Sequence, residues 1–139
     1  MDNNYKQLFK YGFHDCAIDC ITVLEGKMEL VFPSGVYMLN CDGKETDLTK
    51  QCKVVLEVEK LKPASIWKYV DIRLISPCGI REMEFEEFVN LIKTDSFQVD
   101  MQFYSFFCNT ILIRGYVSTD KYEIVISNVQ EISIIFAND

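Results

Sequence analysis

Apolar and polar residues alternate along most of this chain, which is typical of β-strands that turn one face to a core and the other to solvent. The clearest case is residues 27–32, KMELVF, in which every second side chain is apolar. Turn-forming residues interrupt the alternation, among them Gly26 and the Pro-Ser-Gly sequence at 33–35. Short segments joined by tight turns predict antiparallel strands, because parallel strands need long crossover connections.

We expect about nine strands, each alternating or rich in Val, Ile, Thr, Tyr and Phe: 14–24, 27–32, 36–39, 52–59, 66–75, 97–105, 111–117, 122–126 and 132–136. Residues 40–51 are polar and contain Asp42-Gly43, so they predict a loop. The 139 residues suffice for one domain but not for two cores. The expected fold is a single mainly β (α+β) domain, 1–139, with an antiparallel meander curled into a sandwich or a partial barrel.

One amphipathic helix is expected near residues 83–93. Its apolar residues recur at the spacing of a single helix face: Phe85, Phe88, Val89 and Ile92. Acidic residues gather at the expected helix start, where the helix dipole favours negative charge. Lys93 falls in the last turn, and the polar residues 94–96 end the helix.

The chain is acidic, with a formal net charge of −7. A negative surface is repelled by nucleic-acid phosphates and by anionic lipid, so we expect neither a nucleic-acid nor a membrane partner. The polar N-terminal sequence resembles no signal peptide, and the uncharged stretch 101–113 is too short to cross a bilayer. These features predict a cytoplasmic protein with six reduced cysteines.

Catalytic and cofactor motifs are sparse. The six glycines are scattered singly, so no phosphate-binding loop is present, and the cysteine spacing predicts no metal site and no cofactor. His14, Asp15 and Cys16 alone combine a base, an acid and a nucleophile. On an extended strand His14 and Cys16 share one face, but side chains two residues apart rarely come within hydrogen-bond reach. We therefore predict structural roles for all three.

Two features favour binding. Four glutamates lie within six residues at the expected helix start: Glu82, Glu84, Glu86 and Glu87. Such a patch would attract a basic protein and speed its association. In the strand 97–105, alternation places Tyr104 and Phe106 on the same row as polar residues, where Tyr104 could anchor a partner if that face is open.

The segment FHDCAIDCITVLEGKMELVF resembles the start of small β-rich bacterial proteins of uncharacterised function, some of them similar to immunity proteins of polymorphic toxin systems. The similarity rests on seven positions: His14, Asp15, Ile18, Ile21, Gly26, Leu30 and Phe32. It implies a small β-rich fold and a protein partner, and it assigns a function to no individual residue.

We interpret the sequence first as a non-catalytic protein-binding module, immunity-protein-like, that binds a basic protein partner. The alternative is a small-molecule-binding, barrel-like protein, because curled sheets can enclose a ligand. An enzyme that depends on Cys16 and His14 is the third hypothesis. The sequence leaves open whether the chain forms a homo-oligomer.

Overall fold

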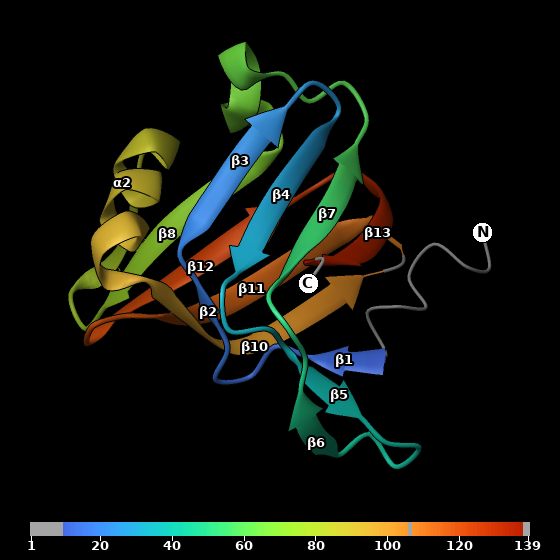
Figure 1. The fold of residues 1–139 in the computed structure, drawn as a ribbon. Helices are drawn as coiled ribbons and strands as arrows, with labels where there is room; N and C mark the ends of the chain where they lie inside the picture. The colour runs from blue at the N-terminus through green and yellow to red at the C-terminus, as the bar shows by residue number, and fades with distance from the viewer. Residues whose placement is uncertain (1–9, 106, 138–139) are drawn as a thin grey trace.

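The computed structural model describes residues 10–105 and 107–137, which contain thirteen strands in three antiparallel sheets (Figure 1). Two of the sheets pack face to face, so the expected mainly β, sandwich-like fold is confirmed. No closed barrel forms within these residues. The count exceeds the nine strands expected because several strands are only two to four residues long.

The larger sheet has six strands. In spatial order they are β2 (Ala17–Ile18), β10 (Phe97–Ser105), β11 (Thr110–Val117), β12 (Asp120–Ile126), β8 (Val70–Ser76) and β9 (Gly79–Glu82). Three of its strands, β10 to β12, form the expected meander. The strands β8 and β9 form a hairpin whose turn contains Pro77 and Cys78.

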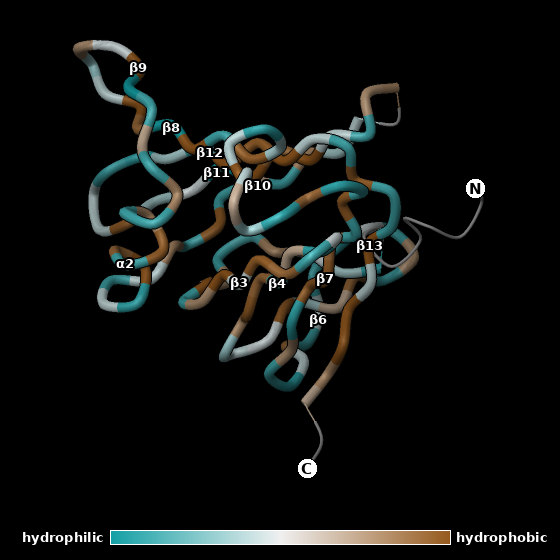
Figure 2. Tube along the Cα trace, turned by 90° about the horizontal axis from the view of Figure 1, so that it is seen from above, coloured by the Kyte–Doolittle hydropathy of each residue, from teal (hydrophilic) through white to brown (hydrophobic). Residues whose placement is uncertain are grey.

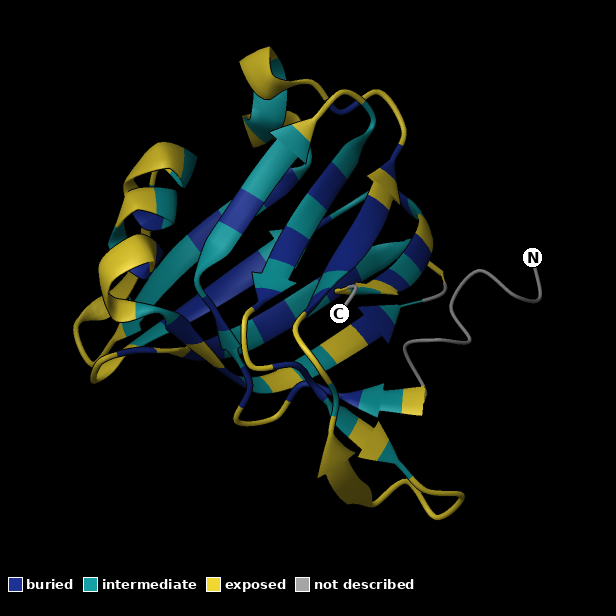
Figure 3. Cartoon of the chain, in the orientation of Figure 1, coloured by how far each residue is buried: buried dark blue, intermediate teal, exposed yellow. Residues whose placement is uncertain are grey.

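The second sheet has four strands: β13 (Val129–Phe136), β7 (Cys52–Val58), β4 (Lys27–Phe32) and β3 (Cys20–Leu24). Its inner residues face those of the larger sheet, and burial alternates along the strands as the sequence predicts (Figure 3). Large side chains fill the space between the sheets, among them Phe13, Phe32, Phe97, Met28, Leu30, Leu56, Ile111 and Ile113. Together these described residues form one packed core between the sheets.

A small third sheet lies below the sandwich and consists of β1 (Tyr11–Gly12), β5 (Tyr37–Leu39) and β6 (Glu45–Leu48) (Figure 1). The strand β6 falls in the polar segment 40–51 that predicted a loop. All four of its residues are exposed, so the segment lacks the alternation that identifies a strand.

The expected helix is present as α2 (Phe85–Asp95). It lies along one side of the sandwich and contacts β3 and β8, so it bridges the two sheets (Figures 1 and 2). Its anchor is Phe88, whose ring centroid lies 5.6 Å from that of Phe97 and 5.4 Å from that of Tyr122. No helix in the described residues has the length and apolarity needed to cross a bilayer.

Two short connections cross between the sheets instead of closing hairpins. Asp19 separates β2 in the larger sheet from β3 in the smaller one, and residues 127–128 separate β12 from β13. Asn128 adopts a positive φ of 60°, which turns the chain sharply at the second corner. The expectation that consecutive strands pair was wrong at residues 127–128, and also after residues 33–35, where β5 joins the third sheet instead of pairing with β4. At Asp19 the structure divides the single strand expected over 14–24 into β2 and β3.

Residues 66–69 were expected to begin a strand but belong largely to a 3-10 helix, η1 (Pro63–Lys68). Its proline fixes φ near the helical value at the first turn. The strand β8 then starts at Val70. This helix stands at the end of the sandwich next to α2, and it forms one wall of the site described below.

A β-bulge in β10 changes which residues face the core. Val99 pairs with Gly115 and Met101 pairs with Arg114, so Asp100 is an extra residue in β10. One extra residue reverses the alternation beyond it. As a result Met101 and Phe103 are exposed and Tyr104 is buried, the opposite of what uninterrupted alternation predicts.

Candidate functional site

The four glutamates singled out from the sequence line one groove, although they come from different elements. Glu82 ends β9, Glu84 is the N-cap residue of α2, and Glu86 and Glu87 lie in the first helical turn. All four are exposed. The groove has a volume of about 470 Å³, and its other wall is η1 with the start of β8.

The link between β9 and α2 holds the glutamates in place. The backbone N–H of Met83 donates a hydrogen bond to the carbonyl oxygen of Ile72 at 2.8 Å, which ties the end of β9 to β8. Met83 and Phe85 pack against the core. Alternation in this extended link therefore turns Glu82 and Glu84 towards solvent. The first helical hydrogen bond joins the Phe88 N–H to the Glu84 carbonyl at 3.1 Å.

The opposite wall contains an exposed aromatic side chain that the sequence analysis missed. Trp67 lies on η1 with 75% of its surface exposed, and it is the one tryptophan of the chain. The Nζ of Lys68 lies 5.6 Å from the centroid of its ring, in a cation–π arrangement. Residues 66–75 were expected to form a strand. Residues 66–68 belong to η1 instead, and this places Trp67 beside the glutamates.

The groove is strongly negative. Five carboxylates are among the described residues that line it, together with no lysine, arginine or histidine. The fifth is Asp71, which pairs with Arg73 at 3.0 Å just outside the groove. Carboxylates beside an exposed indole and apolar side chains such as Pro63 and Ile66 suit a cationic group carried on an apolar stem.

Tyr104 does not belong to this site, so the structure corrects its assignment as an exposed anchor. Its side chain has only 8% of its surface exposed, and its hydroxyl donates to Oδ1 of Asn109 at 3.2 Å. The strands β11, β12 and β8 separate β10 from β9, which places Tyr104 about 19 Å or more from Glu82. The exposed aromatic of β10 is Phe103. Phe106 lies outside the described residues.

The residues His14, Asp15 and Cys16 form a turn rather than an extended strand, and Asp15 has a positive φ of 64°. The expectation that His14 and Cys16 share a face is therefore wrong. The imidazole is exposed, with Nδ1 at 2.7 Å from the Asp100 carbonyl oxygen and Nε2 at 3.3 Å from Oδ2 of Asp15. The hydrogen bond to the Asp100 carbonyl and the nearby carboxylates raise the pKa of His14.

The Cys16 thiol points into the protein instead. It is buried, and its Sγ lies 3.8 Å from the Gly12 carbonyl and 3.7 Å from the His14 carbonyl. Burial raises the pKa of Cys16 to about 11, so the thiol stays protonated at neutral pH. A nucleophilic cysteine needs a thiolate, and this arrangement does not supply one.

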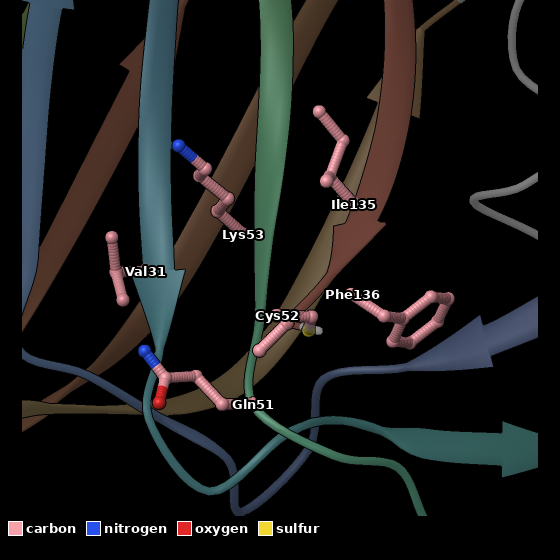
Figure 4. Close-up of a pocket in the computed structure, with 7 residues that line it drawn as sticks. Val31, Gln51, Cys52, Lys53, Ile135 and Phe136 are labelled. Carbon is pink, nitrogen blue, oxygen red and sulfur yellow. The ribbon is translucent and has the colours of Figure 1, made fainter. Parts of the chain in front are cut away.

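Another hollow lies at the ends of β4, β7 and β13, with Cys52, Lys53, Ile135 and Phe136 among its lining residues (Figure 4). Its volume is about 210 Å³, below the range of roughly 300–1,000 Å³ typical of small-molecule sites. Within the described residues no group of three His, Cys, Asp or Glu side chains is arranged to hold a metal ion.

Comparisons of the chain with protein-family models, with curated proteins and with solved structures give no match.

Proposed function

We propose that this protein is a non-catalytic binding module that captures a basic protein partner in the acidic groove, in the manner of an immunity protein that neutralises a toxin. The observation that supports the proposal is the convergence of Glu82, Glu84, Glu86 and Glu87 with Trp67 in one groove. These residues come from three elements of the fold, so the charge cluster is a property of the folded protein and not only of a glutamate-rich sequence.

Electrostatics supports this choice of partner. Carboxylates grouped at a helix start repel one another, and the helix dipole offsets only part of that repulsion. A lysine or arginine from a partner would relieve the repulsion, and its aliphatic stem could pack on Trp67. The basic side chain would then replace Lys68 at the indole ring, where that lysine now lies.

The alternatives have less support. A barrel-like ligand site between the sheets has less support because large buried side chains fill that space. The cysteine-dependent enzyme lacks an accessible thiolate at Cys16.

Trp67 allows a direct test because it is the single tryptophan and lines the groove. The probe is a synthetic twenty-residue peptide of alternating Lys and Ser, which contributes no tryptophan fluorescence. We expect a saturable change in Trp67 emission at low ionic strength that weakens as added salt shortens the Debye length. The matched control is a Glu-Ser peptide of the same length, which should cause no change. Absence of a saturable response to the Lys-Ser peptide would contradict the proposal.

A further inference from the structure

The outer face of the six-stranded sheet is a second surface with an unusual charge pattern. The four-stranded sheet covers only the inner face (Figure 2). Strand register places several exposed apolar side chains on the outer face: Met101, Phe103, Tyr116 and Ile80. Exposed apolar residues gathered on one sheet face favour a docking surface.

A row of alternating charges crosses this face in register. Glu82 on β9 pairs with Arg73 on β8, Arg73 with Glu123 on β12, and Glu123 with Arg114 on β11. Two of the three neighbouring pairs interact directly: Nη2 of Arg114 lies 2.6 Å from Oε2 of Glu123, and Nη1 of Arg73 lies 3.9 Å from Oε1 of Glu123. The sequence of charges across the four strands is minus, plus, minus, plus.

When a row of four alternating charges faces a second copy of itself in reverse order, every charge lies opposite a charge of the other sign. A two-fold axis that runs parallel to the strands, between β8 and β12, reverses the order of the row. We infer that this face binds a second copy of the chain about that axis. In the dimer Glu82 lies opposite Arg114 of the partner subunit. The middle pair, Arg73 and Glu123, contributes less across the interface, because Glu123 is only 8% exposed and already accepts hydrogen bonds from Arg114 of its own chain. A two-fold axis along the row would instead oppose like charges, so the charge pattern selects a single arrangement.

The neighbouring row of residues on this face is also consistent with a two-fold axis parallel to the strands. Ile80 on β9, Ile75 on β8, Lys121 on β12 and Tyr116 on β11 follow one another in register. The two-fold axis places the exposed Ile80 against Tyr116 of the partner subunit, so that two apolar side chains that are exposed in the monomer become covered. Both arginines of the charged row have about a third of their side-chain surface exposed (37% and 34%), which leaves them accessible to a partner.

The size of the face predicts a weak dimer. Four strands at a spacing of about 4.8 Å and seven residues at a rise of about 3.3 Å give a surface of roughly 440 Å² per copy. Interfaces of this size belong to reversible, transient complexes. We therefore expect a dimer that forms at high protein concentration and dissociates on dilution.

The test uses two charge reversals at the ends of the row, with the oligomeric state followed by sedimentation velocity over a range of concentrations. Glu82→Arg and Arg114→Glu should each raise the dimer dissociation constant at least tenfold, because each turns two attractive pairs into two repulsive ones. Mixing the two variants should restore dimerisation, since every pair across that heterodimer is again of opposite charge. Controls of equal charge change on the outer face of the other sheet, Lys53→Glu and Glu57→Lys, should dimerise as the wild type does.

Three outcomes would overturn the inference: a wild-type chain that stays monomeric at millimolar concentration, a dimer that both reversals leave intact, or two monomeric variants that fail to associate when mixed. If circular dichroism shows that Arg114→Glu does not fold, Arg114→Gln replaces it in the mixture, and Glu82→Arg alone must still weaken the dimer. Because Glu82 also lines the groove, Arg114→Glu, which lies outside it, separates loss of the dimer from loss of groove function.

Discussion

Replacing Gly115 with alanine tests the register of β10 and β11, which places both the bulge and the charged row. Gly115 lies opposite Val99, next to the extra residue Asp100. A Cβ added at Gly115 would lie 2.8 Å from Cζ of Phe97 and 3.0 Å from the carbonyl carbon of Gln98, and closer still to the Gln98 carbonyl oxygen. The Gln98 atoms belong to the backbone, so β10 itself must move to relieve the overlap.

Overpacking of this kind lowers the free energy of unfolding by about 1–3 kcal/mol. Because the added Cβ overlaps backbone atoms, we expect a loss at the upper end of this range, about 3 kcal/mol, for Gly115→Ala. The alanine recovers part of this, roughly 0.5–1 kcal/mol, because glycine within a strand is itself unfavourable. The net loss of about 2 kcal/mol should lower Tm by about 4–8 °C for a domain of this size. Differential scanning calorimetry measures the change.

Gly43→Ala is the matched control. Gly43 has a positive φ of 76°, and an added Cβ there meets no atom within 4 Å. Its cost is conformational only, about 1 kcal/mol, so its effect on Tm should be the smaller of the two. A Gly115→Ala protein with an unchanged Tm would refute the register between β10 and β11.

Two further predictions follow from titratable groups. Burial raises the pKa of Cys16 to about 11, so iodoacetamide at neutral pH should label the exposed Cys78 and leave Cys16 intact. Peptide mass spectrometry measures the labelling of each cysteine, and equal labelling of the two would contradict the burial of Cys16. Glu57 on β7 lies opposite Glu131 on β13. The hydrogen bond and the charge repulsion between these two carboxyl groups raise the pKa of Glu131. Protonation therefore favours the folded state, and that stabilisation is lost as pH rises through the raised pKa. Glu131→Gln should raise Tm at neutral pH, and the gain should vanish below the ordinary glutamate pKa of about 4.3; a gain independent of pH would contradict this origin.

Local pattern predicted the fold class and the helix well, because both depend on which residues enter the core. Periodicity over residues 83–93 located the helix to within two residues of α2. The alternation KMELVF became β4, with alternate residues buried. An antiparallel sheet with one face on the core and the other in solvent produces this alternation of apolar and polar residues.

Strand order was not predictable in the same way. Ser127-Asn128 resembles a hairpin turn in composition and Asp19 resembles the interior of a strand, yet each carries the chain into the other sheet. Nothing local distinguishes the two outcomes, since the partner of the next strand depends on which edge is free in the assembled fold.

The candidate site was predicted in part. The four glutamates were identified from their density, but Glu82 was expected at the helix start and lies at the end of β9, in register with Arg73. Tyr104 was misplaced because a single extra residue, Asp100, reverses the faces of β10, and no sequence signal marks that bulge. Trp67 was missed because η1 interrupts what looked like a continuous strand.

The association rate of the Lys-Ser peptide tests the central claim most directly. The variant Glu84→Gln/Glu86→Gln/Glu87→Gln removes three groove carboxylates, and its fold should persist because exposed sites usually change stability by only about 0.5 kcal/mol each. The control Glu57→Gln/Glu59→Gln/Glu131→Gln removes the same charge away from the groove. Stopped-flow fluorescence of Trp67 at low ionic strength should show association at least tenfold slower for the groove variant, the size typical of electrostatic steering. The control variant should stay close to the wild-type rate. Equal rates for the groove variant and the wild type would contradict the claim that this groove captures a basic partner.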